Sequence, residues 1–285
     1  MAHNRHRTAG TLRMRTGISW LRMVRGRGDV AERSISTHHV RGQRQRSSFP
    51  MTSFYTAFAD HYEKVFPVRE PAVAFLLDAV PPGARVLDLG CGPGHHCGRL
   101  AAADRQPEGL DLDEGMIRAA RGRYPGIPFH VGDLAALSAL SGGWDAAYCI
   151  GNVASHVDDA GTAGWLADLA ARLPAGGALV VQTVDWDALA GASSHRFADL
   201  ELGGGVVFER EYRDLGPVRT RFLTRLVMQG RTLFAGEVTL FPRSATAWRD
   251  LFARAGFDAT GHFADFARAP YAIGAGGSVW LAHRR

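Results

Sequence analysis

Residues 86–94 read Val-Leu-Asp-Leu-Gly-Cys-Gly-Pro-Gly, an apolar strand that runs directly into three glycines. In doubly wound α/β folds, ligands bind in the crevice where a strand ends and a helix begins, and glycine lets the backbone approach a ligand closely. The dinucleotide-binding form of this loop requires a further glycine where His95 stands, and no Gly-Lys-Ser/Thr sequence follows, so the loop disfavours NAD and nucleoside triphosphates. Taken alone, the loop indicates a tight strand-to-helix turn in an α/β protein.

Strand and helix patterns alternate around this loop. Apolar runs predict strands, and helical periodicity in the segments between them predicts crossover helices. Strands joined in this way form a parallel sheet that is covered on both faces. The predicted fold is therefore doubly wound α/β, with strands over 85–89, 107–110, 127–131, 145–150 and 178–183 and helices that begin at Gly94 and span 114–123 and 160–173.

A different pattern follows in residues 204–241. Three successive strand patterns separated by turn sequences predict an inserted antiparallel β meander there. After it, one helix and two strands complete a predicted seven-stranded, mostly parallel sheet. The strands of the meander span 206–213, 219–228 and 232–241, the helix spans 244–255, and the last two strands span 257–263 and 278–282.

The first fifty residues differ from the rest in composition. They hold eleven Arg, few aliphatic residues and no helical or strand periodicity, so burial cannot offset the entropy of ordering them. We expect residues 1–50 to be a disordered basic extension. A nucleic-acid-binding arm, an organellar targeting peptide and a start codon placed too early all explain it. The helical pattern directly after Met51, and Lys64 as the chain's single Lys, favour the third explanation.

The charge of the chain is unevenly distributed. Residues 1–50 carry a net charge of +9, which leaves −4 for residues 51–285 of a chain whose total is +5. Phosphate contacts need concentrated basic surface, so a nucleic-acid partner is disfavoured. No apolar run is long enough to predict a membrane-spanning helix. The three cysteines form no C-x-x-C pair and follow no signal peptide, so a cytoplasmic location is expected.

Acidic residues end the two strands that follow the glycine loop. Asp111 closes the strand in Glu-Gly-Leu-Asp-Leu-Asp, and Asp133 follows the next strand in His-Val-Gly-Asp-Leu. Both carboxylates are expected at the edge of the sheet where the loop lies. One carboxylate can accept from two ribose hydroxyls, and the other can accept from an adenine amino group. A single strand-end acid is more often a helix cap, which is the role expected for Asp113.

The combined pattern resembles the class I S-adenosylmethionine-dependent methyltransferases over residues 84–184 and again in the last strand. The resemblance implies a Rossmann-like methyltransferase fold over residues 51–285 and S-adenosyl-L-methionine as cofactor. It implies that Asp111 holds the ribose and that Asp133 and Leu134 bracket the adenine. The glycines that pass the methionine portion are then Gly90, Gly92 and Gly94.

Three neighbouring residues complete the expected cofactor site. Leu112 and Met116 are apolar side chains that can enclose the purine, although core packing accounts equally well for Met116. Asp88 is acidic at the end of an apolar strand, where burial is costly unless the charge is matched. The resemblance implies that Asp88 orders the glycine loop near the ammonium group of the cofactor.

The turn after the fourth strand reads Gly151-Asn152-Val153-Ala154-Ser155-His156. It resembles the GN-x-x-x-H turn of glycine and sarcosine N-methyltransferases, and it lacks the Asn/Asp-Pro-Pro-aromatic turn of enzymes that methylate exocyclic base amines. Asn152 and His156 are the candidate catalytic residues, and Gly151 is a candidate cofactor contact. His156 can take a proton from a hydroxyl acceptor or orient an amine. Capping of the following helix, or a bond to the backbone, accounts for His156 equally well.

Two further segments are expected to close the site. Residues 51–80, with predicted helices over 52–66 and 69–80, resemble the opening of small bacterial methyltransferases and form a helical cap, which makes Tyr55, Tyr62 and Arg69 candidate contacts. Aromatic helix faces are more often simple packing. The meander is expected to be a lid over the acceptor. Its arginines are candidates for binding an acidic substrate, although strand alternation predicts a solvated face for most of them: Arg210, Arg213, Arg219, Arg221 and Arg225.

These features predict methyl transfer from S-adenosylmethionine to a small-molecule amine or hydroxyl acceptor by in-line displacement, without a metal. Two alternatives stay open. The chain can be an RNA or protein methyltransferase that uses residues 1–50 as a docking arm, or a non-catalytic S-adenosylmethionine-binding protein.

Overall fold

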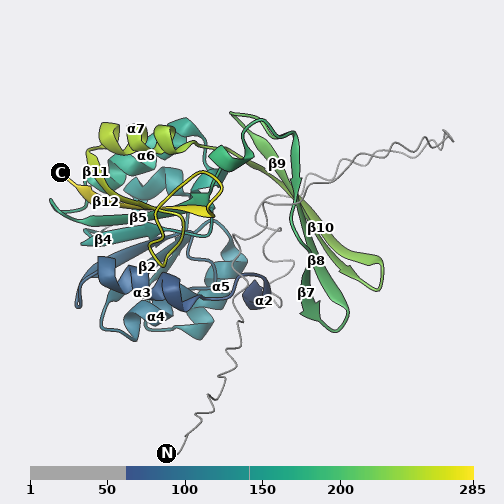
Figure 1. The fold of residues 1–285 in the computed structure, drawn as a ribbon. Coiled ribbons are helices and arrows are strands. Elements are labelled where there is room, and N and C mark those ends of the chain that lie inside the picture. Colours follow the sequence, from purple (N-terminus) through teal and green to yellow (C-terminus); the bar gives the residue numbers. More distant parts are fainter. Residues whose placement is uncertain (1–61, 141) are drawn as a thin grey trace, which may run out of the picture.

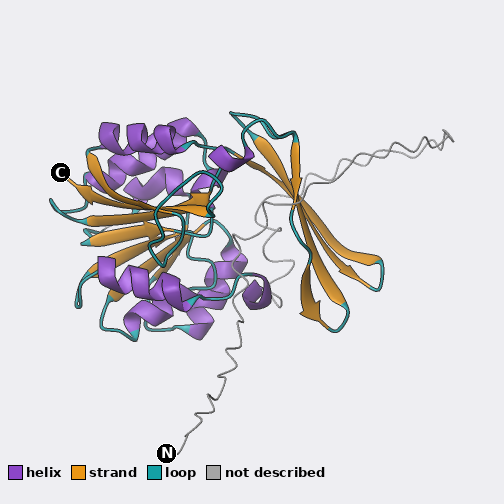
Figure 2. Cartoon of the chain, viewed as in Figure 1, coloured by secondary structure: helices purple, strands orange, loops and turns teal. Residues whose placement is uncertain are grey.

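The computed structural model of the chain describes residues 62–140 and 142–285. Two sheets organise this part of the chain (Figure 1). One is a seven-stranded sheet with helices on both faces, and the other is a five-stranded sheet that stands beside it (Figure 2). The predictions for residues 1–50, and for the cap before Tyr62, lie outside the described residues.

The seven-stranded sheet has the order β11-β12-β5-β4-β1-β2-β3, and β12 alone runs against the others. This order confirms the predicted doubly wound, mostly parallel fold. From β1 the chain builds β2 and β3 on one side and then crosses to build β4 and β5 on the other. The strand order therefore reverses between β1 and β4, which makes the crevice at their carboxyl ends the expected ligand site. The strands are β1 Arg85–Leu89, β2 Gln106–Asp111, β3 Phe129–Val131, β4 Ala146–Cys149, β5 Ala178–Val184, β11 Phe257–Phe263 and β12 Gly277–Arg284.

Helices cover the two faces of this sheet because successive strand residues point to opposite sides. In β1, Leu87 packs with α6 and α7, whereas Val86 packs with α3. Fully buried Trp165 and Trp248 anchor α6 and α7 in the larger of these two clusters. The helices are α2 Tyr62–Val65, α3 Glu70–Ala79, α4 His95–Ala101, α5 Glu114–Arg123, α6 Asp159–Ala170 and α7 Ala245–Ala255.

Side-chain caps fix where three of these helices begin. Asp113, Asp158 and Ser244 each accept a hydrogen bond from a backbone N–H in the first turn of α5, α6 and α7 respectively. Such a bond satisfies a donor that has no partner within the helix. The predicted capping role of Asp113 is confirmed. No helix within 62–140 or 142–285 is both long and apolar enough to span a membrane.

The second sheet is antiparallel and contains the three predicted strands of the meander, β8 Val206–Arg213, β9 Thr220–Met228 and β10 Arg231–Leu240. Two short strands that the sequence patterns missed, β6 Ser194–Arg196 and β7 Leu200–Gly203, also pair with β8. The inserted sheet therefore begins at residue 194 rather than 204. Along β8 the side chains alternate strictly between a buried and a more exposed face.

Candidate functional site

The glycine loop lies between β1 and α4 and is fastened to the neighbouring strand. Gly90 and Cys91 both donate their backbone N–H groups to the carbonyl of Leu110 in β2, at 2.7 and 3.0 Å. The φ angles of Gly90, Gly92 and Gly94 are +82°, +53° and +77°, in the left-handed region that side chains with a Cβ avoid. The loop therefore needs glycine at these positions for its conformation.

The turn after β4 and helix α2 approach the loop closely at Gly90 and at Gly92. A Cβ on Gly90 would lie 2.4 Å from a methyl carbon of Val153 in the turn after β4, and one on Gly92 would lie 2.9 Å from the hydroxyl of Tyr62 in α2. The turn after β4 and helix α2 thus meet at the glycine loop. The backbone of the loop is enclosed by these two elements.

Asp111 at the end of β2 contacts the same loop. Its Oδ2 accepts from the backbone N–H of Gly92 at 2.8 Å, and its Oδ1 accepts from the N–H of Asp113 at 2.9 Å. Each carboxylate oxygen has a further lone pair, so Asp111 can still accept from two hydroxyl groups of a ligand. Burial raises the pKa of this carboxyl group above its ordinary value, while the backbone donors oppose that shift.

Asp88 lies beneath the loop in β1 and is buried. Its Oδ2 accepts from the hydroxyl of Tyr148 at 2.9 Å and from the thiol of Cys97 at 3.4 Å. Burial raises the pKa of Asp88 to about 7, because the charged form loses its hydration and these two hydrogen bonds recover only part of that loss. A cation close to the loop would stabilise the ionised form of Asp88.

The turn after β4 is locked to β5. The N–H of Gly151 donates to the side-chain carbonyl of Gln182 at 2.7 Å. The carboxamide oxygen of Asn152 accepts from Ser155 Oγ at 2.7 Å and from the N–H of Val184 at 3.1 Å. Asn152 therefore shapes the turn, and its φ of +65° is one that Asn tolerates better than most residues. A catalytic role for Asn152 stays a prediction.

His156 ends this turn in the short 3₁₀ helix η3, Val153–His156. Burial lowers its pKa to about 4, so the imidazole is neutral at physiological pH. Ser155, its neighbour, accepts from the indole N–H of Trp186 at 3.2 Å and donates its own hydroxyl to the carboxamide oxygen of Asn152. The turn thus presents a neutral imidazole next to a rigid, hydrogen-bonded frame.

Comparison with known proteins agrees with this geometry. Residues 86–177 match the family model of the methyltransferase domain. The matched range contains the glycine loop, Asp111, and the Gly151–His156 turn.

Individual relatives match over parts of the chain. The trans-aconitate 2-methyltransferase of Methylobacterium nodulans is 44% identical over 86 residues, which are 28% of this chain and 33% of that protein. The dTDP-4-amino-2,3,4,6-tetradeoxy-D-glucose N,N-dimethyltransferase of Saccharopolyspora spinosa is 36% identical over 55 residues, 19% of this chain and 22% of that protein. The chain spans only about a third of the length of the curated relatives it matches.

The likeness in fold to solved structures extends beyond the matched range. The CcbJ methyltransferase from Streptomyces caelestis superposes with a TM-score of 0.72, covering 83% of this chain and 99% of that chain at 17% identity. At this identity the likeness concerns the fold. It includes more of the chain than the matched residues 86–177 alone.

The residues present fit S-adenosylmethionine. Asp111 offers acceptors for two ribose hydroxyls, and the ammonium group of the cofactor would match the charge of ionised Asp88. Asp133 is exposed and accepts from the N–H of Ala135 at 2.9 Å, as the cap of η2, Leu134–Ala139. Its role toward adenine stays a prediction.

The apolar residues predicted around the purine divide into two kinds. Leu112 is half-buried at the carboxyl edge of the sheet, where a ligand can reach it. Leu134 and Met116 are 5% and 3% exposed, so both contribute mainly to the core. For Met116, this burial favours the packing explanation.

Of the three candidate contacts in the cap, the structure describes Tyr62 and Arg69. Tyr62 reaches the glycine loop at Gly92, whereas Arg69 stands exposed at the start of α3. Tyr55 lies outside the described residues. The four-residue spacing of aromatic residues in the cap signals a buried face, but that spacing does not single out Tyr62.

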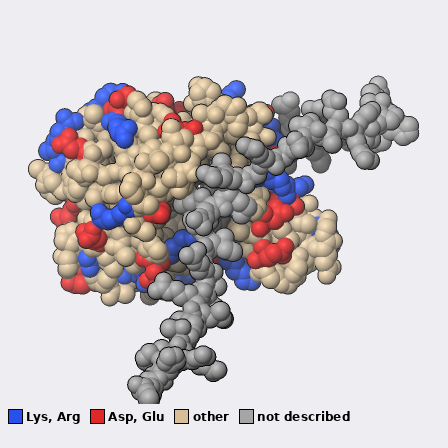
Figure 3. Space-filling model, viewed as in Figure 1, with Lys and Arg blue, Asp and Glu red and all other residues tan. Residues whose placement is uncertain are grey.

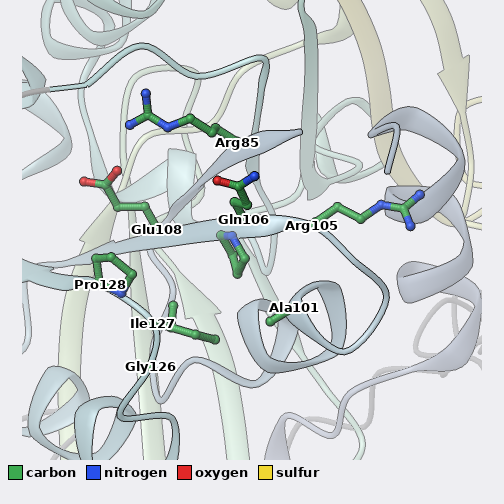
Figure 4. A pocket seen from close by; sticks show the side chains of 9 residues that line it. Arg85, Ala101, Arg105, Gln106, Glu108, Gly126, Ile127 and Pro128 are labelled. Atoms are coloured by element: carbon green, nitrogen blue, oxygen red, sulfur yellow. The ribbon is translucent and has the colours of Figure 1, made fainter. Parts of the chain in front are cut away.

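A pocket of about 370 Å³ lies at the opposite edge of the sheet, at the amino ends of β1 and β2 (Figure 4). Ligands of doubly wound folds bind at the carboxyl ends of the strands instead. The guanidinium group of Arg105, which lines this pocket, already donates to the carbonyls of Val80 and Leu77 at 2.9 and 2.8 Å. The pocket therefore takes no part in the candidate site.

We expect the pKa of Asp88 to govern the stability of the cofactor-free protein. Above about pH 4 the carboxyl group ionises in the unfolded chain, whereas the folded chain keeps it protonated until about pH 7. The folded state then binds the extra proton, so the free energy of unfolding falls as the pH rises from about 4 to 7. In Asp88→Asn this contribution, about 2–4 kcal/mol, is absent.

Thermal melts of the wild type and Asp88→Asn at pH 5 and pH 8 measure this effect. The variant is expected to gain stability relative to the wild type at pH 8. Asp258→Asn, which changes an exposed carboxylate, serves as the control. The same pH dependence in wild type and Asp88→Asn would show that Asp88 is not the responsible group.

Proposed function

We propose that the chain transfers a methyl group from S-adenosylmethionine to a small-molecule acceptor. The observation that carries this proposal is the contact of Val153 with the glycine loop. It puts the turn that ends in His156 directly against the loop, whose Gly92 N–H is bound by Asp111. The glycine loop and Asp111, which are suited to hold a cofactor, therefore lie beside the turn of His156, which is suited to act on an acceptor.

When bound, S-adenosylmethionine supplies a methyl group on a sulfonium centre that its positive charge already activates for displacement. The chain then has to hold the acceptor in line and exclude water. An aromatic cluster beside the turn is suited to both tasks: Trp186 and Tyr212 have ring centroids 5.1 Å apart, and Tyr212 lies 4.9 Å from Phe197 and 5.2 Å from Phe222. Trp186 also holds Ser155 in the turn.

The relatives support a small acceptor. By their names, one acts on trans-aconitate and another on a dTDP-linked amino sugar. We propose an acceptor of similar size that carries an amine or a hydroxyl group, the hydroxyl including that of a carboxylic acid. A screen of small amines, amino sugars, phenols and organic acids, read by release of S-adenosylhomocysteine, tests the proposal. Release that requires RNA or a protein instead would overturn it.

The alternative of an RNA methyltransferase receives no support from the described surface. In the view of Figure 3, basic and acidic side chains alternate over the visible face, and no basic stripe runs across it. Among the described residues, many charged side chains form ion pairs, such as Arg99 with Glu70 and Arg268 with Asp78. The visible part of this face therefore lacks the concentrated positive charge that phosphate backbones require.

The neutral His156 leads to a prediction about pH. With its pKa near 4, His156 stays unprotonated from pH 5.5 to 8.5, so the rate of transfer is expected to show no inflection near pH 6.5. Replacing His156 with Gln is expected to lower kcat for a hydroxyl acceptor about 100-fold or more, the usual contribution of a general base, and to lower it less for an amine.

The measurement is kcat against pH for the wild type and His156→Gln with an acceptor from the screen. His130→Gln, on β3 at the far edge of the sheet, is the control and is expected to keep the wild-type kcat. An inflection near pH 6.5 that disappears in His156→Gln would disprove the neutral state of His156.

A further inference from the structure

A short segment connects the inserted sheet to helix α7. Residues 241–244 run from the end of β10 to the first turn of α7 (Figure 1). The backbone N–H of Phe241 donates to the carbonyl of Ser155 at 2.7 Å. Arg243 is only 5% exposed, although it belongs to no helix or strand. The segment therefore lies against the turn of His156.

The guanidinium group of Arg243 contacts this turn at two points. Its Nη1 donates to the carbonyl of Ala154 at 3.1 Å, and its Nη2 donates to the carbonyl of Val157. Ser155 and His156 lie between these two carbonyls along the chain. The guanidinium thus holds the backbone on both sides of His156.

Protein groups surround the charge of Arg243. Its Nε donates to Oδ1 of Asp159 at 2.8 Å, and its guanidinium lies 5.7 Å from the ring centre of Trp248 in α7. Burial lowers the pKa of Arg243, and the carboxylate of Asp159 opposes that shift. Bonded in this way, the guanidinium is suited to hold the turn rather than to bind a ligand.

The second half of the turn has little other support from its own backbone. Helix η3 is a single 3₁₀ turn, and hydrogen bonds in 3₁₀ helices have poorer geometry than those in α-helices. The bond from the N–H of Val157 to the carbonyl of Ala154 is long, at 3.4 Å. Hydrogen bonds from a charged donor are roughly twice as strong as those between neutral groups. The bonds from Arg243 are therefore the stronger constraint on this half, which contains His156.

We propose that Arg243 is a positioning residue for methyl transfer, which holds the imidazole of His156 in place by fixing the backbone on both sides of it. This inference rests on the proposed function, in which His156 acts on the acceptor. Misplacement of a reacting group by about 1 Å can lower a rate roughly 100-fold, so a residue that only fixes the position of His156 has a large effect on turnover.

The sequence patterns singled out the arginines of the meander, and Arg243 lies just after it. Arg213, Arg221 and Arg225 each form an ion pair with a glutamate of the inserted sheet. These pairs stay within that sheet, whereas the contacts of Arg243 reach the turn after β4. The role of Arg243 depends on contacts with residues more than 80 positions away, which no local pattern encodes.

Kinetics of the full chain with an acceptor from the screen test this inference. Arg243→Met is expected to lower kcat about 10- to 100-fold, while the KM for S-adenosylmethionine changes by less than about twofold. Arg243→Lys keeps the charge, but an ammonium group is a point charge that cannot span both carbonyls, so kcat is expected to fall about three- to tenfold. If Arg243→Met fails to fold in a thermal melt, Arg243→Lys still supplies the test. A wild-type kcat in the folded variants would overturn the inference.

Arg105→Met is the matched control. Arg105 also donates to two backbone carbonyls, those of Val80 and Leu77, but at the opposite edge of the sheet. The control is expected to melt at a lower temperature than the wild type and to keep its kcat. A loss of kcat equal to that of Arg243→Met would attribute the effect to general destabilisation and would overturn the positioning role.

A double-mutant cycle shows whether Arg243 acts through His156. In the background of His156→Gln, Arg243→Met is expected to lower kcat by less than about threefold more, because the side chain that it positions is already absent. The full loss seen in the wild-type background, repeated in His156→Gln, would show that Arg243 acts independently of His156 and would overturn the inference.

Nitrogen NMR of the imidazole of His156 gives a readout that needs no acceptor. In the full chain saturated with S-adenosylhomocysteine, the His156 signals are assigned by their loss in His156→Gln. They are expected to shift or broaden in Arg243→Met and to stay in place in Arg105→Met. Unchanged His156 signals in Arg243→Met would overturn the inference. Absence of transfer by the wild type to every acceptor would overturn the proposed function, and the NMR comparison would still decide whether Arg243 positions His156.

Discussion

Asp111→Ala is expected to weaken S-adenosylmethionine binding roughly 30- to 150-fold, a loss of about 2–3 kcal/mol. The substitution removes the acceptors for the ribose hydroxyls. It also removes the bond from the N–H of Gly92, which fixes the middle of the glycine loop. Isothermal titration calorimetry of the variant and the wild type measures the difference.

Asp113→Asn is the matched control, because it lies two residues away and its side-chain oxygen caps α5. An Asn oxygen can accept the same hydrogen bond from Met116, so the cap is retained. The affinity of this variant is expected to stay within about twofold of the wild type. Equal affinities for Asp111→Ala and the wild type would rule out Asp111 as a ligand of the ribose.

Gly90→Ala is expected to destabilise the protein by about 2–5 kcal/mol. Placing alanine at φ +82° costs roughly 1–2 kcal/mol. A Cβ at 2.4 Å from Val153 adds about 1–3 kcal/mol of overpacking, because the branched side chain cannot move without shifting the turn after β4. Denaturant unfolding of the cofactor-free chain measures the loss.

Gly83→Ala isolates the conformational part of this effect. Gly83 has a similar φ of +76°, but a Cβ there would meet no atom within 4 Å. It is expected to cost only about 1–2 kcal/mol. If the two variants lost the same free energy of unfolding, the close contact between the glycine loop and the turn after β4 would not contribute to stability.

Local patterns predicted most of the main sheet. Strand β1 and helix α5 begin and end where the patterns placed them, because β1 is an apolar run buried on both faces and α5 buries one apolar face. Strand β8 was predicted equally well from its alternation. Strands β6 and β7 were missed because they are short, and β6 has the polar sequence Ser-His-Arg. They exist through pairing with β8, which no local pattern encodes.

The residues of the candidate site also differ in how far the sequence alone could predict their roles. The position of Asp111 beside the glycine loop was predictable. In a doubly wound sheet, the strand that follows the loop along the chain ends at the same edge of the sheet as the loop. The use of Asn152 to join the turn to β5 depends on a contact with Val184, 32 residues away. Strand alternation predicted a solvated outer face for most arginines of the meander. That Arg210 is instead buried depends on which face of the sheet packs inward, and no local pattern shows this.

Binding of S-adenosylmethionine is the most direct test of this account. Calorimetric titration of the full chain is expected to show one site for S-adenosylmethionine, from which S-adenosylhomocysteine displaces it. No binding of NAD is expected, because the NAD-binding form of the loop requires glycine where this chain has His95. Binding of NAD in place of S-adenosylmethionine, or the absence of S-adenosylmethionine binding, would contradict it.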